Sequence, residues 1–202
     1  MIKVTIEPDS DCENPVNDDS TWTLISFNRN HVGYESPDNY LEAKYDSSRS
    51  GTNVKERTSI EPANITIRNK MKAGTAFKLD YFEHGNSVWS LHGEGPQCQF
   101  DTSRHAGMLL WNNPVKDMGY KTYEDRQKDA RNFLKYYTSW CNGETYWYKI
   151  EKMVDGEWEE IDSCGGFIGV DTIKEAITDA VRIYKNIEYN DLAQWIMKDT
   201  IV

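Results

Sequence analysis

Long apolar segments are missing from this chain of 202 residues. No run of about 18 apolar residues occurs, which is the length that a membrane-spanning helix needs. Met1 to Glu7 likewise include no apolar stretch as long as that of a signal peptide. These absences predict a cytoplasmic protein that does not enter a membrane.

Closely spaced cysteines are also missing. The four cysteines are scattered, and no pair has the C-x-x-C spacing of a zinc knuckle or a redox site. The G-x-x-x-x-G-K signature of a phosphate loop does not occur either. We therefore expect reduced, mostly buried thiols, and the sequence identifies no cofactor and no metal ion.

Basic residues are few. The chain has 23 Lys and Arg against 33 Asp and Glu, which gives a formal net charge of -10 and a pI near 4.9. A protein that grips phosphates needs a net supply of Lys and Arg, so this balance argues against direct binding of nucleic acid. A partner protein with a basic surface fits better, and the alternative is that the acidity only keeps the protein dispersed.

Aromatic residues, in contrast, are plentiful, with 7 Trp, 12 Tyr and 6 Phe. We expect much of the core to be aromatic. The length fits a single domain over residues 1–202, with a possible strand-and-loop extension over residues 1–62. The fold class that the patterns favour is α+β, a mostly antiparallel sheet covered by two or three helices.

Strand patterns recur along the chain. Asp155-Gly156 is a strong turn signal for a hairpin joining residues 145–151 to 158–161. The other segments with strand patterns are residues 1–6, 21–27, 65–67, 77–83, 88–91 and the apolar run 107–111. Residues 46–58 are polar and are expected to form a loop.

Helical periodicity marks four segments. A short helix is expected from Pro37 to Tyr45, and a long amphipathic helix from Thr122 to Cys141, where Thr122 and Asp125 resemble a capping box. A third helix is capped by Asp171 and extends towards Tyr184. Residues 192–197 add one or two final turns.

The densest group of candidate functional residues is His84, His92, Cys98, Asp101 and His105. These residue types ligate zinc and transfer protons, but gaps of eight, six and seven residues do not force them together. Cys98 could be a nucleophile activated by His84 or His105. The alternative to a functional site is that the histidines and Asp101 are ordinary polar residues of hairpin turns and that Cys98 is a buried core thiol.

Two further segments extend this candidate ligand site. Asp101 and Arg104 precede the apolar run and could place a carboxylate and a guanidinium at a strand end. Cys164, followed by Gly165-Gly166, could belong to a turn whose backbone amides bind an anion. Ordinary turn hydrogen bonds are the alternative for both segments, and the residue patterns favour this alternative. An enzyme would gather its site from His84, Cys98, Asp101, Arg104 and Cys164.

Acidic and aromatic residues near the second hairpin suggest a partner-binding surface. Strand alternation requires some of the aromatic rings there to point away from the core. The candidate contacts are Trp147, Trp158, Glu157, Glu159 and Glu160, together with Asp18 and Asp19 near the N-terminus. The alternative is a solvated acidic face.

From about Phe77 to Tyr184 the chain resembles a family of uncharacterised proteins of bacteriophages and bacterial mobile elements. The resemblance rests on His84-Gly85, Cys98 with Phe100-Asp101-Thr102, Gly107, Tyr137, Gly143, Tyr146 to Glu151, Asp162-Ser163-Cys164 with Gly166-Phe167, and Gly169. Gly165 and His105 depart from the family pattern.

The resemblance implies an origin in a mobile element and no known reaction. Together with the charge, it suggests a non-enzymatic phage accessory protein in the cytoplasm of the host bacterium. Such a protein would bind and inhibit a host defence or nucleic-acid-processing protein, and copying the phosphate spacing of DNA is one way to do so. The alternative is a small-molecule-binding or metal-dependent enzyme with a site near His84, Cys98 and Asp101.

Overall fold

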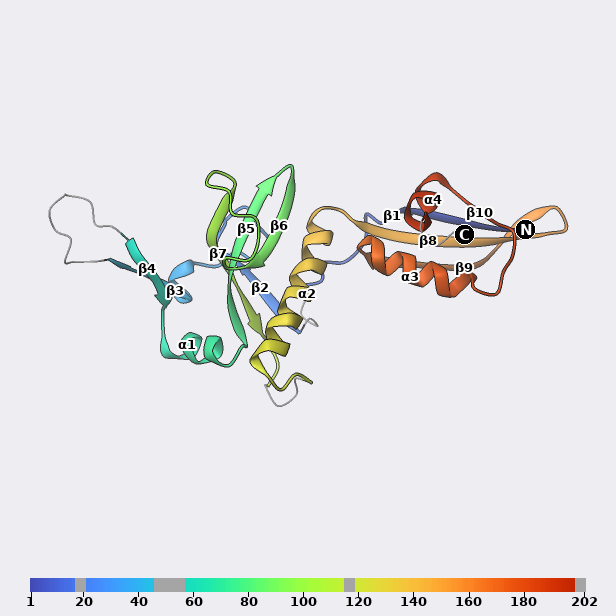
Figure 1. Cartoon of the computed structure of the whole chain (residues 1–202). Helices are drawn as coiled ribbons and strands as arrows, with labels where there is room; N and C mark the ends of the chain where they lie inside the picture. The colour runs from blue at the N-terminus through green and yellow to red at the C-terminus, as the bar shows by residue number, and fades with distance from the viewer. Residues whose placement is uncertain (17–20, 46–56, 115–118, 199–202) are drawn as a thin grey trace. The chain divides into compact units, whose positions relative to one another are not determined.

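The computed structural model describes residues 1–16, 21–45, 57–114 and 119–198. Asp18, Asp19 and most of the expected loop 46–58 lie outside these ranges. The fold is α+β with mostly antiparallel sheets, as the sequence predicted, and the described residues contain four α-helices (Figure 1). None of these helices is long and apolar enough to cross a membrane.

Backbone contacts divide the chain into two compact units, where the sequence suggested one domain. The first unit combines Met1–Pro15 with Tyr136–Val202, and the second is Val16–Lys135. The boundary near residue 135 falls inside one continuous helix, so no linker composition marks it. The strands within residues 1–62 join different sheets.

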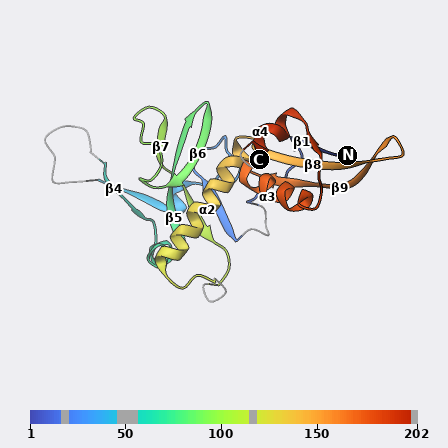
Figure 2. The ribbon, with the colours of Figure 1, turned by 45° about the vertical axis from the view of Figure 1, so that its right-hand side comes forward.

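The first unit is a four-stranded sheet with two helices on one face. Its strand order is β10 (Ile187–Tyr189), β1 (Ile2–Pro8), β8 (Thr145–Val154) and β9 (Glu157–Ile168). The β8–β9 hairpin turns at Asp155 and Gly156, both at positive φ, as the sequence predicted. The helices are α3 (Val170–Val181) and α4 (Asp191–Met197) (Figure 2).

The core of the first unit follows from strand and helix periodicity. Ile2, Val4 and Ile6 share one face of β1, and Ile173 and Ile177 share one face of α3. Each fully buried side chain of this size stabilises the fold by about 1.5–3 kcal/mol. Asn190 caps α4 through the Ala193 amide and also exchanges hydrogen bonds with both backbone groups of Ile6, which ties the helix to the sheet.

The second unit is built on another four-stranded sheet. Its order is β2 (Trp22–Ser26), β7 (Thr102–Trp111), β5 (Ala76–His84) and β6 (Asn86–Leu91). Helix α2 (Tyr123–Cys141) begins in this unit, where the indole of Trp22 donates a 2.8 Å hydrogen bond to Asp129. Thr122 caps α2 by accepting from the Asp125 amide, as expected.

Two sequence predictions were wrong in the second unit. Residues 37–45 form a 3₁₀ turn, η1 (Pro37–Asn39), followed by β3 (Leu41–Tyr45), because β3 gains a strand partner in β4 (Arg57–Pro62). Residues 65–67 begin helix α1 (Ile65–Lys72) and are not a strand. The Asn64 side chain accepts from the Ile67 amide and so starts the helix.

Candidate functional site

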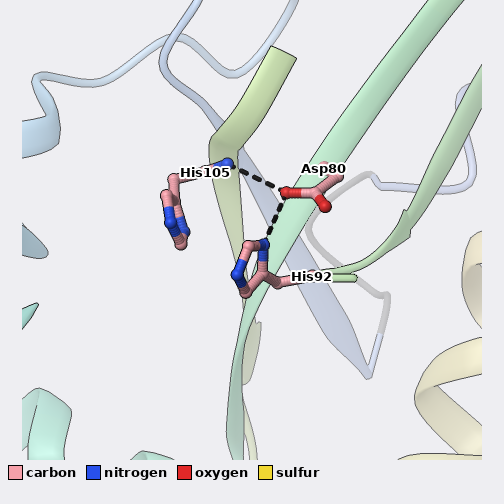
Figure 3. A group of neighbouring side chains, drawn as sticks. All are labelled: Asp80, His92 and His105. Atoms are coloured by element: carbon pink, nitrogen blue, oxygen red, sulfur yellow. Dashed lines mark hydrogen bonds and ion pairs between the residues drawn. The ribbon is translucent and has the colours of Figure 1, made fainter. Parts of the chain in front are cut away.

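Asp80, His92 and His105 lie together in the second unit (Figure 3). Asp80 belongs to β5, His105 belongs to β7, and His92 directly follows the end of β6, so two strands and the turn after a third supply the group. Asp80 is buried, with 1% of its surface exposed, while the side chain of His92 is 39% exposed. The group is therefore anchored in the sheet and open to solvent on the His92 side.

Asp80 is held by several donors. One carboxylate oxygen accepts from His92 Nδ1 and from the His105 amide, each at 2.9 Å, and the other accepts from the Gly93 amide at 2.9 Å. The side-chain amide nitrogen of Gln97 lies 3.5 Å from this second oxygen. Burial by itself raises the pKa of Asp80, but these hydrogen bonds lower it further than burial raises it, so the net pKa lies below its usual value. Asp80 is therefore an ionised, acceptor-only group near neutral pH.

The two histidine rings are in contact, with centroids 4.0 Å apart. An irregularity in β7 brings His105 to this position. Leu79 pairs with Gly107 whereas Tyr81 pairs with Ser103, so β7 holds extra residues opposite Asp80. His105 lies there at φ 53°, a left-handed conformation that non-glycine residues seldom adopt.

His84, Cys98 and Asp101 also come together. Asp101 contacts His84 Nδ1 at 3.2 Å, and the same oxygen accepts a hydrogen bond from the Cys98 thiol at 3.3 Å. The carboxylate thus stands between the imidazole and the sulfur. Activation of a thiol requires the base to contact the sulfur, and in the described residues His84 contacts Asp101 instead.

The remaining members of the predicted ligand site do not join this group. Arg104 is an exposed residue of β7. Cys164 is exposed in β9, in the other unit. The expected anion-binding turn after Cys164 is part of strand β9, and the Gly166 amide donates 2.8 Å to the carboxylate of Asp9. The Gly166 amide is therefore already hydrogen-bonded to a side chain of the protein itself instead of to an external anion.

The acidic residues of the second hairpin lie on β9, the edge strand of its sheet. Residues 157–166 of β9 are exposed except for half-buried Trp158. In the described residues β9 pairs with β8 along one edge and with no strand along its other edge. Glu157, Glu159 and Glu160 are exposed as expected, whereas Trp147 is half-buried. The Lys3 ammonium lies 5.7 Å from the centre of the Trp158 ring.

Sequence reasoning missed Asp80. It named His92 and His105 as part of a longer group, but Asp80 lies in a strand whose alternation places even-numbered residues away from the core. The burial of Asp80 depends on the Gly93 amide and on the β7 irregularity. An acidic residue in the middle of the strand, directly between Leu79 and Tyr81, is the one sequence signal that could have indicated it.

Comparison with known proteins gave no relatives. No protein family model, no curated protein and no solved structure matches the chain. The function has to be argued from the residues themselves.

Proposed function

We propose that this protein acts by binding a partner protein through the outer edge of β9. The observation that supports the proposal is the exposure of residues 157–166, apart from half-buried Trp158, along a strand that has a neighbour on only one side in the described residues. Unpaired strand edges present a row of backbone donors and acceptors, and an extended segment of another protein can add to them as a further strand.

Charge defines the partner. Asp162 lies opposite Ile150 in the register with β8, and Tyr148 donates a hydrogen bond to it, so Asp162 belongs to the helix-covered face of the sheet. Glu160 lies opposite Glu151 on the other face. Acidic side chains therefore flank the strand edge on both faces, and an extended segment rich in Lys or Arg is the complementary partner.

Nearby lysines offset this charge only in part, since Lys152 lies opposite Glu159 in the β8–β9 register. Lys3 and Lys149 both pair with Glu151 on β8, at 3.4 Å and 3.0 Å. In the part of the chain that the structure describes, no ion pair involves Glu157 or Glu159. Acidic groups on an edge strand also prevent two copies from pairing with each other, and the experiment below separates that role from partner binding.

The resemblance to phage proteins directs the proposal to a host protein. Inhibition of a host defence or nucleic-acid-processing protein is the biological role that we propose, in the cytoplasm of the host. If the acidic edge occupies a DNA-binding cleft, DNA will compete with it, and high salt will release the partner.

The test is an affinity pull-down from host lysate with the tagged full chain, at low and high salt, followed by mass spectrometry. The test variant carries Glu157→Lys, Glu159→Lys and Glu160→Lys. The matched control carries Glu175→Lys, Asp179→Lys and Glu188→Lys, which change the net charge equally at exposed sites of the same unit. We expect one stoichiometric partner that the control retains and the test variant loses.

Two results would contradict the proposal. Retention of the partner by the test variant would remove β9 from the interface. If no partner is found and the test variant dimerises in solution while the wild type stays monomeric, the acidic edge only prevents self-pairing.

A second candidate function is a small-molecule-binding or metal-dependent enzyme near His84, Cys98 and Asp101. The contact of Asp101 with both other side chains favours it. Inactivation of a screened activity by a thiol reagent, and loss of the same activity in Cys98→Ser, would support this candidate. Activity that survives Cys98→Ser unchanged would remove Cys98 from it.

A further inference from the structure

The ligand-type atoms of Asp80, His92 and His105 form a compact group. One such atom from each residue lies within 4.8 Å of the other two. In a tetrahedral zinc complex with bonds of about 2.0–2.1 Å, neighbouring ligand atoms are about 3.3 Å apart. The group therefore needs to contract by at most about 1.5 Å, which small side-chain rotations can supply.

The hydrogen bond between Asp80 and His92 marks one edge of the group. Since the ionised carboxylate of Asp80 can only accept, the proton of this bond belongs to His92 Nδ1. The two atoms are 2.9 Å apart, so one ion that binds both would displace this proton, which the neutral ring can carry on Nε2 instead. Figure 3 shows the His92 ring between Asp80 and His105.

His105 occupies its place at an energetic cost. A left-handed conformation costs a non-glycine residue about 1–2 kcal/mol, and strained backbone of this kind concentrates at functional sites. The irregularity in β7 directs the His105 amide to Asp80 and its ring to His92. Glycine would adopt this backbone conformation at a lower energetic cost. The presence of histidine therefore suggests that its imidazole ring has a function.

We propose that Asp80, His92 and His105 bind one divalent transition-metal ion of the Zn²⁺ class. Two imidazoles and a carboxylate are a ligand set that suits zinc and its neighbours in the first transition row. Three protein ligands leave at least one coordination position for water or for a further ligand, and the exposed side of His92 gives access to it. This site is independent of the β9 edge, which belongs to the other unit.

The experiment uses the full chain, stripped with a chelator and titrated with Zn²⁺ by calorimetry and with Co²⁺ by visible absorption. The test variants are His92→Ala and His105→Gly. His105→Gly removes the ring while favouring the observed backbone conformation and keeping the amide that bonds Asp80. We expect one ion per wild-type chain, and at least about 100-fold weaker binding in either variant.

His84→Ala and Cys98→Ser are the matched controls, because His84 is 76% exposed and both residues belong to the neighbouring group around Asp101. We expect both to bind the ion as the wild type does, without the intense absorption of a Co²⁺–thiolate bond. Three results would overturn the proposal: a wild type that binds no ion, binding that survives in both test variants, and binding lost only in the controls. Circular dichroism of each variant establishes that it is folded.

Discussion

The carboxylate of Asp9 accepts a 2.8 Å hydrogen bond from the amide of Gly166, which lies 157 residues further along the chain. Asp9 also exchanges two hydrogen bonds with Thr145, one from its own amide and one from the threonine hydroxyl. One residue after β1 therefore fixes the start of β8 and the irregular end of β9. The position of the proposed binding strand depends on this contact.

Asp9→Ala should lower the free energy of unfolding by about 1 kcal/mol, since a charge-assisted hydrogen bond is lost at a partly exposed site. Urea unfolding followed by circular dichroism measures the difference. Asp11→Ala removes a nearby exposed carboxylate, and its effect should stay within about 0.5 kcal/mol. Equal effects of the two substitutions would show that the contact with Gly166 contributes nothing.

Asp80→Asn should be much more damaging, with a loss of about 3 kcal/mol in metal-free buffer. The amide can accept through only one atom, so at least one of the buried donors around it loses its acceptor. The comparison is Asp38→Asn, an exposed carboxylate in η1, which should behave as the wild type. Thermal unfolding of both variants in the presence of a chelator provides the measurement. A stable Asp80→Asn variant would mean that the donors find water instead.

Asn64→Ala should lower the free energy of unfolding by about 1 kcal/mol, because the Asn64 side chain caps α1. Asn69→Ala, an exposed position inside the same helix, is the control and should be neutral or slightly stabilising. Urea unfolding of the two variants gives the comparison. If both substitutions are neutral, the cap has no role in holding α1.

The error at α1 shows where the sequence was ambiguous. Ile65-Thr66-Ile67 is β-branched and apolar, which favours a strand in a short window. Two features favour a helix in the structure. Asn64 caps the first turn, and Ile67 is buried in a core cluster with Met108 and Ala76. The long helix α2 and the Asp155-Gly156 hairpin were predictable because local signals there agree with each other over many residues.

The candidate site was predictable in part. Pairing between β5 and β7 explains why His84 and Asp101 meet, but no sequence pattern predicts the register of these two strands, which are not joined by a hairpin. His92 and His105 were in the predicted group, while Asp80 was not. The extra residues in β7 that bring His105 to Asp80 leave no trace in hydrophobic periodicity, because a bulge changes pairing without changing composition.

Tyr148 gives a prediction at high pH. Burial raises its pKa, and the hydrogen bond to Asp162 raises it further, to about 12. An unfolded tyrosine has a pKa of about 10, so the folded protein keeps a proton that the unfolded chain loses. The resulting stabilisation is complete below pH about 10 and is lost as the pH rises to about 12. The free energy of unfolding should be measured for Tyr148→Phe and for the wild type across this range. The difference between the two should shrink as the pH rises.

Asp162→Asn is the control for Tyr148. It removes the negative charge that helps to hold the phenolic proton, so the loss of stability should be smaller and should end at a lower pH than in the wild type. A difference between wild type and Tyr148→Phe that stays constant with pH would remove Tyr148 as the titrating group.

Gly107→Ala should be the most destabilising of these substitutions, by about 3 kcal/mol or more. A Cβ at this position would lie 2.2 Å from the carbonyl oxygen of Ile25 on the neighbouring strand β2. Backbone cannot move aside as a flexible side chain can, so the β2–β7 pairing has to open. Gly119→Ala places its Cβ in open space and should leave the protein unchanged. Since Gly107 also pairs with Leu79 beside the β7 irregularity, Gly107→Ala should weaken Zn²⁺ binding as well. A stable variant with intact metal binding would show that the position of His105 does not depend on this strand pair.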